Sequence, residues 1–302
     1  MLNIKYTKAK FIFRFTKDSI LPQFKSSALR GVLGKALITF NCIGDENCNK
    51  CYFKKSCIVQ NIMSHGLREQ VEFVPKNTSI SSFVIECEDE RTNFKKGDIL
   101  EFYITIFGDS IVFFPQYLYA FQAMENVGLG SYNAKYELVQ VSNDIEEPIF
   151  YDNEFLKFNI KIRTLEEYVS NRFQQIPEVK TINFTTPFRV LKKGKLVRKI
   201  NYKDIIIALY RRLIILNALD GIKVDNTIID LEGNIEEVNS EWINVKRHSN
   251  RQKQDMNFGG VTGKFILPES INEIKEYILA GEIIHIGKNT SFGLGKFEIG
   301  LF

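Results

Sequence analysis

Alternating apolar and polar residues begin the chain, and a helical pattern follows them. Residues Ile4 to Phe15 alternate and are rich in β-forming side chains, which predicts a strand. The segment Gln23 to Phe40 repeats its apolar residues at helical spacing, which predicts a helix. The other elements expected in the first half are strands at Val71 to Val74, Ser82 to Glu88 and Ile99 to Phe107, an amphipathic run from Val112 to Met124, and a strand ending at Val141. Apart from a cysteine-rich insert, the predicted order is βαββαβ.

The second half repeats this order. Its expected elements are strands at Val179 to Val190, Trp242 to His248, Gly263 to Leu267 and Lys296 to Leu301, a strand-like stretch at Glu282 to Ile286, and helices at Tyr202 to Leu219 and Ser270 to Leu279. Pro268 marks the expected entry of the second helix and Gly281 its exit. We therefore predict an α+β fold of two tandem ferredoxin-like (RRM-like) domains. The predicted domains are residues 1–145, with the insert at 41–66, and residues 155–302, joined by the acidic segment Ser142 to Glu154.

Two glycine-spaced runs close the two halves. The terminal run, Gly287 to Phe297, holds three glycines and two lysines, and Val127 to Leu138 repeats its Gly-Leu-Gly pattern. Glycine lets backbone N–H groups approach an anionic chain closely, and lysine adds charge where phosphates lie. The runs therefore fit a polyanion site, with a plain hairpin turn as the alternative because glycine is the default turn residue.

Length and composition favour a folded chain of two domains. A length of 302 residues exceeds the size at which a single core usually stops growing, and 44% hydrophobic with 25% charged residues is ordinary for folded chains. No apolar stretch approaches the roughly 20 residues that span a bilayer. The stretch Met1 to Tyr6 begins a strand pattern without a signal-peptide core, so we expect a cytoplasmic protein with no membrane partner.

Basic residues gather in two segments of the second half. The net charge of +4 leaves the class of partner open. Seven basic residues lie between Arg189 and Arg212 against one acidic residue, Asp204, and Lys246 to Lys253 holds no acidic residue. The second half is expected to present a basic surface, although a solvated lysine-rich loop is the alternative for Lys192 to Lys199.

Four cysteines form a compact cluster with the spacing C-x5-C-x2-C-x5-C. Thiolates at this spacing suit a tetrahedral metal better than disulfides do in a reducing compartment. We expect a structural zinc ion, because four sulfur ligands leave no position open for activating water; an iron–sulfur cluster is the alternative. The predicted ligands are Cys42, Cys48, Cys51 and Cys57. No flavin or dinucleotide site accompanies them.

Several local patterns coincide in one family. The chain resembles the CRISPR precursor-RNA processing endoribonucleases of the RAMP superfamily, in the branch with a cysteine-rich insert in the N-terminal domain. The matching residues are Ala28 to Leu37 before the cysteines, Phe184 to Arg189 before a basic loop, Arg211 to Leu213, Arg247 to Gln252, Gly259 to Gly263, and Gly287 to Phe297.

The resemblance implies two RRM-like folds that bind CRISPR repeat RNA along a positive cleft. It also implies cleavage without a catalytic metal, in which a 2′-hydroxyl attacks the adjacent phosphodiester and leaves 2′,3′-cyclic phosphate and 5′-hydroxyl ends. Such a reaction needs a base, an acid and cations near the phosphate. A cleavage-inactive RNA-binding or scaffold subunit of a CRISPR effector complex is the competing interpretation, because Thr39 to Cys42 replaces the histidine that many relatives carry after the first helix.

The chain offers three histidines for this chemistry. His65 follows the cysteine insert, and His248 lies among basic residues that suit phosphate contact, so both are candidates. His285 is flanked by isoleucines and is expected to be a packed sheet residue. The full predicted site comprises His248, His65 and Arg251 for catalysis, and Arg247, Lys246, Gln252, Gly287, Lys288, Ser291, Gly293, Gly295, Lys296, Lys192 and Lys193 for RNA binding. Either a monomer or a homodimer is compatible with the sequence.

Overall fold

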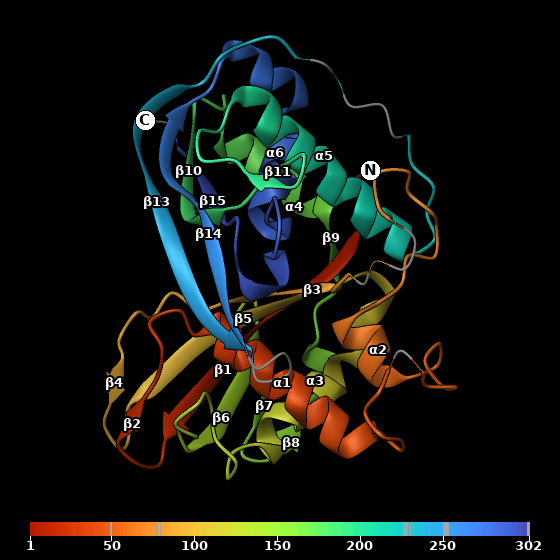
Figure 1. Cartoon of the computed structure of the whole chain (residues 1–302), viewed down its shortest axis with the longest axis vertical. Coiled ribbons are helices and arrows are strands. Elements are labelled where there is room, and N and C mark those ends of the chain that lie inside the picture. The colour runs from red at the N-terminus through yellow and green to blue at the C-terminus, as the bar shows by residue number, and fades with distance from the viewer. Residues whose placement is uncertain are drawn as a thin grey trace. The chain divides into compact units, whose positions relative to one another are not determined.

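The chain folds into two compact units. The structure, a computed structural model, describes residues 1–300 except 49, 76, 77, 79, 226–228, 230 and 250–253, and gives the backbone but not the side chains of 246–249 and 254–257. The N-terminal unit comprises Lys5–Arg163 and Leu219–Gly221; the C-terminal unit comprises Met1–Ile4, Thr164–Ala218 and Ile222–Phe302. Each unit is a sheet with helices packed on it (Figure 1).

The N-terminal unit is built on an antiparallel sheet with strand order β3-β5-β1-β6-β7-β8. Its first four strands have the order of a ferredoxin-like βαββαβ fold, so the predicted mixed α+β class with antiparallel sheets is confirmed. The elements are β1 (Lys5–Phe15), β2 (Ser19–Ile20), α1 (Ser26–Asn41), α2 (Ile58–Met63), β3 (Phe83–Glu86), β4 (Asn93–Phe94), β5 (Ile99–Phe107), a 3-10 helix (Gly108–Phe113), α3 (Phe114–Ala123), β6 (Tyr136–Asn143), β7 (Pro148–Tyr151), β8 (Glu154–Phe155), and a 3-10 helix (Lys157–Asn159). Strand β9 (Arg163–Thr164) pairs with β1.

Aromatic residues of β1 form the centre of the N-terminal core. Residues two apart in a strand point to the same face, so Phe11 and Phe13 share one face of β1, and both belong to a core cluster with buried residues of α1 and α3. The Phe13 ring stacks on Tyr136 of β6 with centroids 4.0 Å apart, and it meets Phe121 of α3 at 5.6 Å. Burying each phenylalanine contributes roughly 1.5–3 kcal/mol. This face therefore fixes α1 and α3 on the sheet.

The C-terminal unit repeats the same topology. Its sheet has the order β13-β14-β10-β15, and α5 and α6 connect its strands as the two helices of a βαββαβ unit do. The elements are α4 (Leu165–Gln175), β10 (Thr181–Phe188), β11 (Leu191–Lys192), β12 (Lys195–Leu196), α5 (Tyr202–Leu219), β13 (Glu236–Ser249), β14 (Gln254–Ile266), a 3-10 helix (Glu269–Ile274), α6 (Lys275–Ile284), a 3-10 helix (Thr290–Phe292), and β15 (Phe297–Gly300).

Helix α4 precedes the repeat and is tied to α6. Thr164 and Glu167 form a reciprocal capping box, which satisfies N–H groups at the start of α4. Near its end, the Arg172 guanidinium binds both carboxylate oxygens of Glu282, at 3.0 and 3.2 Å. Glu282 also accepts a hydrogen bond from the Tyr168 hydroxyl at 2.9 Å. This two-point contact holds α4 against α6.

Three predicted elements differ in the structure. Residues Val71 to Val74 form turns instead of a strand, and Glu282 to Ile286 belongs to the end of α6 and the residues after it. The acidic segment Ser142 to Glu154, which we predicted to be a linker, instead forms the end of β6 and the added strands β7 and β8, and the chain passes between units at Arg163 and Thr164. No helix among the described residues has the length and apolar content needed to cross a bilayer.

Candidate nucleic-acid interface

The terminal glycine run packs onto the end of β10. It is anchored by backbone and hydroxyl hydrogen bonds instead of standing away from the sheet. The bonds are Lys288 N–H to the Arg189 carbonyl (2.8 Å), Gly295 N–H to the Pro187 carbonyl (3.1 Å), the Thr186 hydroxyl to the Gly293 carbonyl (2.7 Å), and Lys296 N–H to the Thr186 hydroxyl (2.8 Å). The run and the Phe184 to Arg189 segment are therefore one structural unit.

The glycines of this run are required by internal packing. Gly295 has φ of 71°, and a Cβ there would lie 1.8 Å from the Ile286 carbonyl oxygen. Gly287 has φ of 94°, and its Cβ would lie 2.7 Å from the Arg189 carbonyl oxygen. Any larger residue would meet both a backbone clash and an unfavourable φ. The N-terminal run has the same property, since a Cβ on Gly128 would lie 2.3 Å from the Asn133 carbonyl oxygen.

The predicted contact residues of the terminal run differ in exposure. Lys288 is exposed, Gly287 and Lys296 are half-buried, and Ser291, Gly293 and Gly295 are buried. The N–H groups of Gly293 and Gly295 already donate to the carbonyls of Thr290 and Pro187. Of these residues, Lys288 therefore presents its charge most directly to solvent, and the predicted RNA contacts of the others stay predictions.

A basic hairpin formed by β11 and β12 lies beside this region. Lys192 and Lys193, both predicted to bind RNA, are exposed, as are Lys195, Arg198 and Lys199. The Lys192 ammonium forms an ion pair with the buried Asp204 carboxylate at 2.7 Å, which ties the hairpin to the first turn of α5. The hairpin is thus anchored at one lysine and presents its other cations to solvent.

Trp242 connects the basic hairpin to the long strands β13 and β14. The Arg198 guanidinium lies 4.8 Å from the centre of the Trp242 ring. A Cβ on Gly259 would lie 2.4 Å from that ring, so glycine is needed where the indole crosses β14. The Gly259 carbonyl in turn accepts a hydrogen bond from Arg189 at 2.9 Å. Burial lowers the pKa of Arg189 from its ordinary value.

We call this group of neighbouring residues the C-terminal basic face. It comprises Lys192, Lys193, Lys195, Arg198, Arg189, Trp242 and Lys288. Sequence reasoning did not assign Trp242 to the site. The signal that could have found it is that the chain's one tryptophan lies in a predicted strand that runs directly into a cluster of basic residues.

The predicted cluster at Lys246 to Gln252 lies at the end of the β13–β14 hairpin. Backbone pairing places Lys246 opposite Asn257 and His248 opposite Asp255. The side chains of Lys246, Arg247 and His248, and all of Arg251 and Gln252, lie outside the described residues. Their assignment to catalysis and RNA binding stays a prediction.

His65 lies in the N-terminal unit, just after α2. Its Nδ1 is 2.7 Å from the Gly66 carbonyl oxygen, and its own carbonyl accepts a hydrogen bond from the Ile80 N–H at 3.0 Å. A carbonyl oxygen only accepts hydrogen bonds, so this contact requires a proton on Nδ1. In the neutral ring that tautomer leaves the Nε2 lone pair free to take a proton.

Charged side chains surround this part of the N-terminal unit. Arg68 forms an ion pair with Asp109, and the Asp109 N–H donates to the Asp220 carboxylate at 3.0 Å. Burial raises the pKa of Asp220, while the Asp109 N–H and the charges of Arg68 and His65 oppose that shift. Gly108, at φ of 61°, leaves room for this carboxylate, because a Cβ there would lie 2.0 Å from it. His65 therefore lies in the field of an acidic group.

Two further arginines, Arg212 and Arg30, and His285 are buried or half-buried. The buried Arg212 donates from Nε to the Ile284 carbonyl at 3.1 Å, and burial lowers its pKa to about 10, so it is not a surface charge. Arg30 is half-buried and donates to the Ser81 hydroxyl at 3.2 Å. His285 is buried as predicted, but it follows α6 instead of lying in a sheet, and its Nδ1 is 3.3 Å from the Leu294 carbonyl oxygen.

The four clustered cysteines line one small cavity between the end of α1 and the start of α2. None of Cys42, Cys48, Cys51 and Cys57 forms a disulfide. Among the described residues, no three His, Cys, Asp or Glu side chains are gathered closely enough to hold a metal ion. Zinc binding by this cluster therefore stays a prediction.

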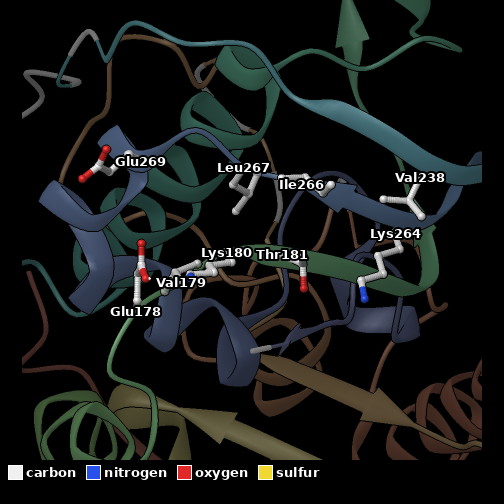
Figure 2. A pocket seen from close by; sticks show the side chains of 9 residues that line it. All are labelled: Glu178, Val179, Lys180, Thr181, Val238, Lys264, Ile266, Leu267 and Glu269. Carbon is white, nitrogen blue, oxygen red and sulfur yellow. Dashed lines mark ion pairs between the residues drawn. The ribbon is translucent and has the colours of Figure 1, made fainter. Parts of the chain in front are cut away.

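A larger groove lies elsewhere on the C-terminal unit, at the start of β10 and the end of β14 (Figure 2). Its volume is about 420 Å³, and its walls combine apolar residues such as Ile266 and Val238 with Lys264. None of the predicted site residues lines it. It is thus separate from the C-terminal basic face.

Comparison with known proteins places both halves of the chain in families. Residues 4–161 match the family model described as the AF_1859_N N-terminal domain, and residues 182–297 match the CRISPR-associated endoribonuclease Cas6. An uncharacterized protein of Archaeoglobus fulgidus is 25% identical over 287 residues, which cover 92% of each chain.

Solved Cas6 structures share the fold at low sequence identity. Thermus thermophilus Cas6 is 14% identical with a TM-score of 0.54, and a Cas6 product complex is 15% identical with a TM-score of 0.55; each match covers 98% of this chain and 99% of the other. A chain of a partial Cas6-RT-Cas1–Cas2 complex is 12% identical with a TM-score of 0.58, and the match covers 98% of this chain but 46% of that longer one. The chain thus belongs to the family with the AF_1859_N N-terminal domain, and its residues 182–297 are similar to the CRISPR-associated endoribonuclease Cas6.

Proposed function

We propose that the protein cleaves CRISPR repeat precursor RNA through attack of a 2′-hydroxyl on the adjacent phosphodiester. A bond forms between the 2′-oxygen and phosphorus, and the bond from phosphorus to the 5′-oxygen breaks. The base takes the 2′ proton, and an acid returns a proton to the leaving 5′-oxygen. The products are a 2′,3′-cyclic phosphate and a 5′-hydroxyl, and the balance requires neither water nor a metal ion.

The contact between His65 and the Gly66 carbonyl carries this proposal. It favours the tautomer whose Nε2 accepts a proton, which is the form that a general base requires. His65 is therefore proposed as the base, and His248 is the alternative residue for that role.

The C-terminal basic face is proposed to bind the RNA backbone. Its exposed lysines and Arg198 offer charge to phosphates, and two of the lysines, Lys192 and Lys195, lie opposite each other on the paired strands β11 and β12. For single-stranded RNA, log affinity falls with log salt concentration, and each phosphate that the protein no longer neutralises makes this slope less steep by about 0.7. We expect Lys193→Gln with Arg198→Gln to weaken binding and reduce this slope. The matched control is Lys95→Gln, which removes an exposed lysine of the N-terminal unit and should leave RNA affinity unchanged.

The test of cleavage combines substrate and protein variants. Repeat RNA is incubated briefly with the protein in EDTA, and the product ends are mapped; a substrate with a single 2′-deoxy nucleotide at the cleavage site should remain intact. His65→Asn keeps an amide donor for the Gly66 carbonyl but removes the base, and it should lower kcat by about 100- to 10,000-fold with unchanged RNA affinity. Cleavage of the 2′-deoxy substrate, or loss of cleavage at once in EDTA, would contradict the mechanism.

The remaining outcomes separate the alternatives. If His65→Asn cuts normally and His248→Ala does not, the base is His248 and the assignment of His65 is wrong. If the unmodified protein binds repeat RNA tightly but yields no product, the protein acts as an RNA-holding subunit of a CRISPR effector complex. The structural neighbours include a complex with Cas1 and Cas2, so we propose that CRISPR proteins receive the guide RNA from this chain.

A further inference from the structure

The cysteine-bearing insert lacks the interactions that usually stabilise a folded segment. In its described residues between Asn41 and Ile58 there is no helix and no strand. Its large apolar side chains are exposed, with 83% of Ile43 and 93% of Tyr52 accessible to solvent. Such a segment buries too little apolar surface to offset the entropy lost on ordering its backbone. Its order therefore needs another source, such as a cross-link.

The cysteines occupy positions where a cross-link would join helix ends. Cys42 follows the last residue of α1, and its N–H donates to the Ile38 carbonyl at 2.9 Å. Cys57 precedes α2, and its carbonyl accepts from the Asn61 N–H at 3.0 Å. Cys48 and Cys51 lie on the turns between them. One ion bound by all four would hold the end of α1, both turns and the start of α2 together.

All four cysteines and Lys54 line the same cavity. Four thiolates around a divalent cation carry a net charge of −2, and the wall of the cavity adds one cation, Lys54, and two acidic side chains, Asp45 and Glu46. Zn–S bonds of about 2.3 Å require the turns carrying Cys48 and Cys51 to close around the ion. These turns are held by short-range backbone bonds such as Lys54 N–H to the Cys51 carbonyl at 3.3 Å, so closure breaks no helix or strand.

We propose that Cys42, Cys48, Cys51 and Cys57 bind one structural zinc ion that fastens the end of α1 to the start of α2. Each thiol releases its proton on binding, and no ligand position remains for water. Helix α2 begins directly after Cys57 and ends at Met63, two residues before His65. The ion therefore also fixes the backbone that carries His65, but it takes no part in the reaction. The zinc site stands whether or not the chain cleaves RNA.

Metal content and thiol chemistry test the proposal without any activity assay. Protein purified without added metal should contain one zinc per chain by mass spectrometry, and a mercurial reagent should release it as the four thiols react. Cobalt(II) bound in its place should give the visible spectrum of a tetrahedral thiolate site. Cys48→Ser and Cys51→Ser should lose the zinc, and Cys87→Ser, outside the insert, should retain it.

Limited proteolysis keeps the proposal testable if the cysteine variants fail to fold. Lys50, Lys54 and Lys55 are exposed in the insert, so trypsin should cut there quickly in metal-free wild-type protein and slowly after zinc is added. Absence of stoichiometric zinc together with no protection by added zinc would overturn the site. Stoichiometric iron with visible absorption in the purified protein would replace zinc by an iron–sulfur cluster and overturn the zinc assignment.

Discussion

Alanine at Gly295 should destabilise the C-terminal unit by about 2–5 kcal/mol. Two costs add at this position. The first is the left-handed backbone at φ of 71°, which costs about 1–2 kcal/mol for a residue with a Cβ. The second is crowding, because the new Cβ lies 1.8 Å from the Ile286 carbonyl oxygen and the chain must move to relieve it, at about 1–3 kcal/mol.

Two further variants separate these costs within the same unit. Gly194 has φ of 77° and no atom within 4 Å of its would-be Cβ, so Gly194→Ala measures the backbone cost alone, about 1–2 kcal/mol. Gly260 has no positive φ, but its Cβ would lie 2.8 Å from the Pro187 side chain and 2.9 Å from the Phe188 carbonyl oxygen. Gly260→Ala therefore measures crowding alone, about 1–3 kcal/mol.

Urea unfolding followed by tryptophan fluorescence measures all three variants. Trp242 is the chain's one tryptophan and lies on β13, so it reports on the C-terminal unit alone. We expect Gly295→Ala to have the lowest midpoint at an unchanged slope. A Gly295→Ala midpoint equal to that of Gly194→Ala would refute the crowding at Ile286. If folded Gly295→Ala loses RNA affinity while Gly260→Ala keeps it, Gly295 also contacts RNA.

Two further predictions concern the N-terminal unit. Burial raises the pKa of the Cys87 thiol to about 11, so below that pH its thiolate fraction rises tenfold per pH unit. Iodoacetamide should therefore label Cys87 far more slowly in native than in denatured protein at pH 8. Peptide mass spectrometry measures both labelling rates. The folded protein holds the Cys87 proton more tightly than the unfolded chain does, so the stability that this proton contributes is present below the ordinary thiol pKa and is lost as pH rises toward 11. Equal labelling rates in the native and denatured protein would contradict the burial of Cys87. Gly31 lies within α1, and no atom lies within 4 Å of the Cβ that alanine would add there. Gly31→Ala should therefore raise the free energy of unfolding by about 0.5–1 kcal/mol, measured by urea or thermal denaturation. A lower free energy of unfolding would contradict the open space at this position.

Long periodic segments are predicted accurately from sequence, and short apolar segments are not. The ranges of β5 and α5 match the expected ones. The apolar residues of β5 recur with a sustained period of two residues, and those of α5 with a period of 3.6 residues. Isoleucines at 283, 284 and 286 fit a strand or a helix equally, and the structure extends α6 through Ile284. The sequence pattern predicts a helix stop at Gly281, but this glycine lies inside α6, where a Cβ would come 2.5 Å from the Phe297 ring.

The candidate site is predicted in outline but not in its contacts. Residue type and charge indicate the basic hairpin, whose exposed lysines the structure retains. Glycine spacing alone does not distinguish an open anion site from a loop packed on its own backbone, and Gly295 shows the second arrangement. The contact of His65 with Gly66 and the closeness of Trp242 to Arg198 depend on tertiary placement, which no local pattern encodes.

The central place of β1 in its sheet has a consequence for synthesis on the ribosome. Its two long neighbours are β5 and β6, and the short β9 also pairs with it, so among the described strands no partner of β1 is made before residue 99, and its second long edge waits until residue 136. During that interval its phenylalanines have no sheet partner, and such long-range pairing is slow to form. A nascent chain stalled before Ile99 should therefore recruit chaperones, and one extended past Asn143 should release them.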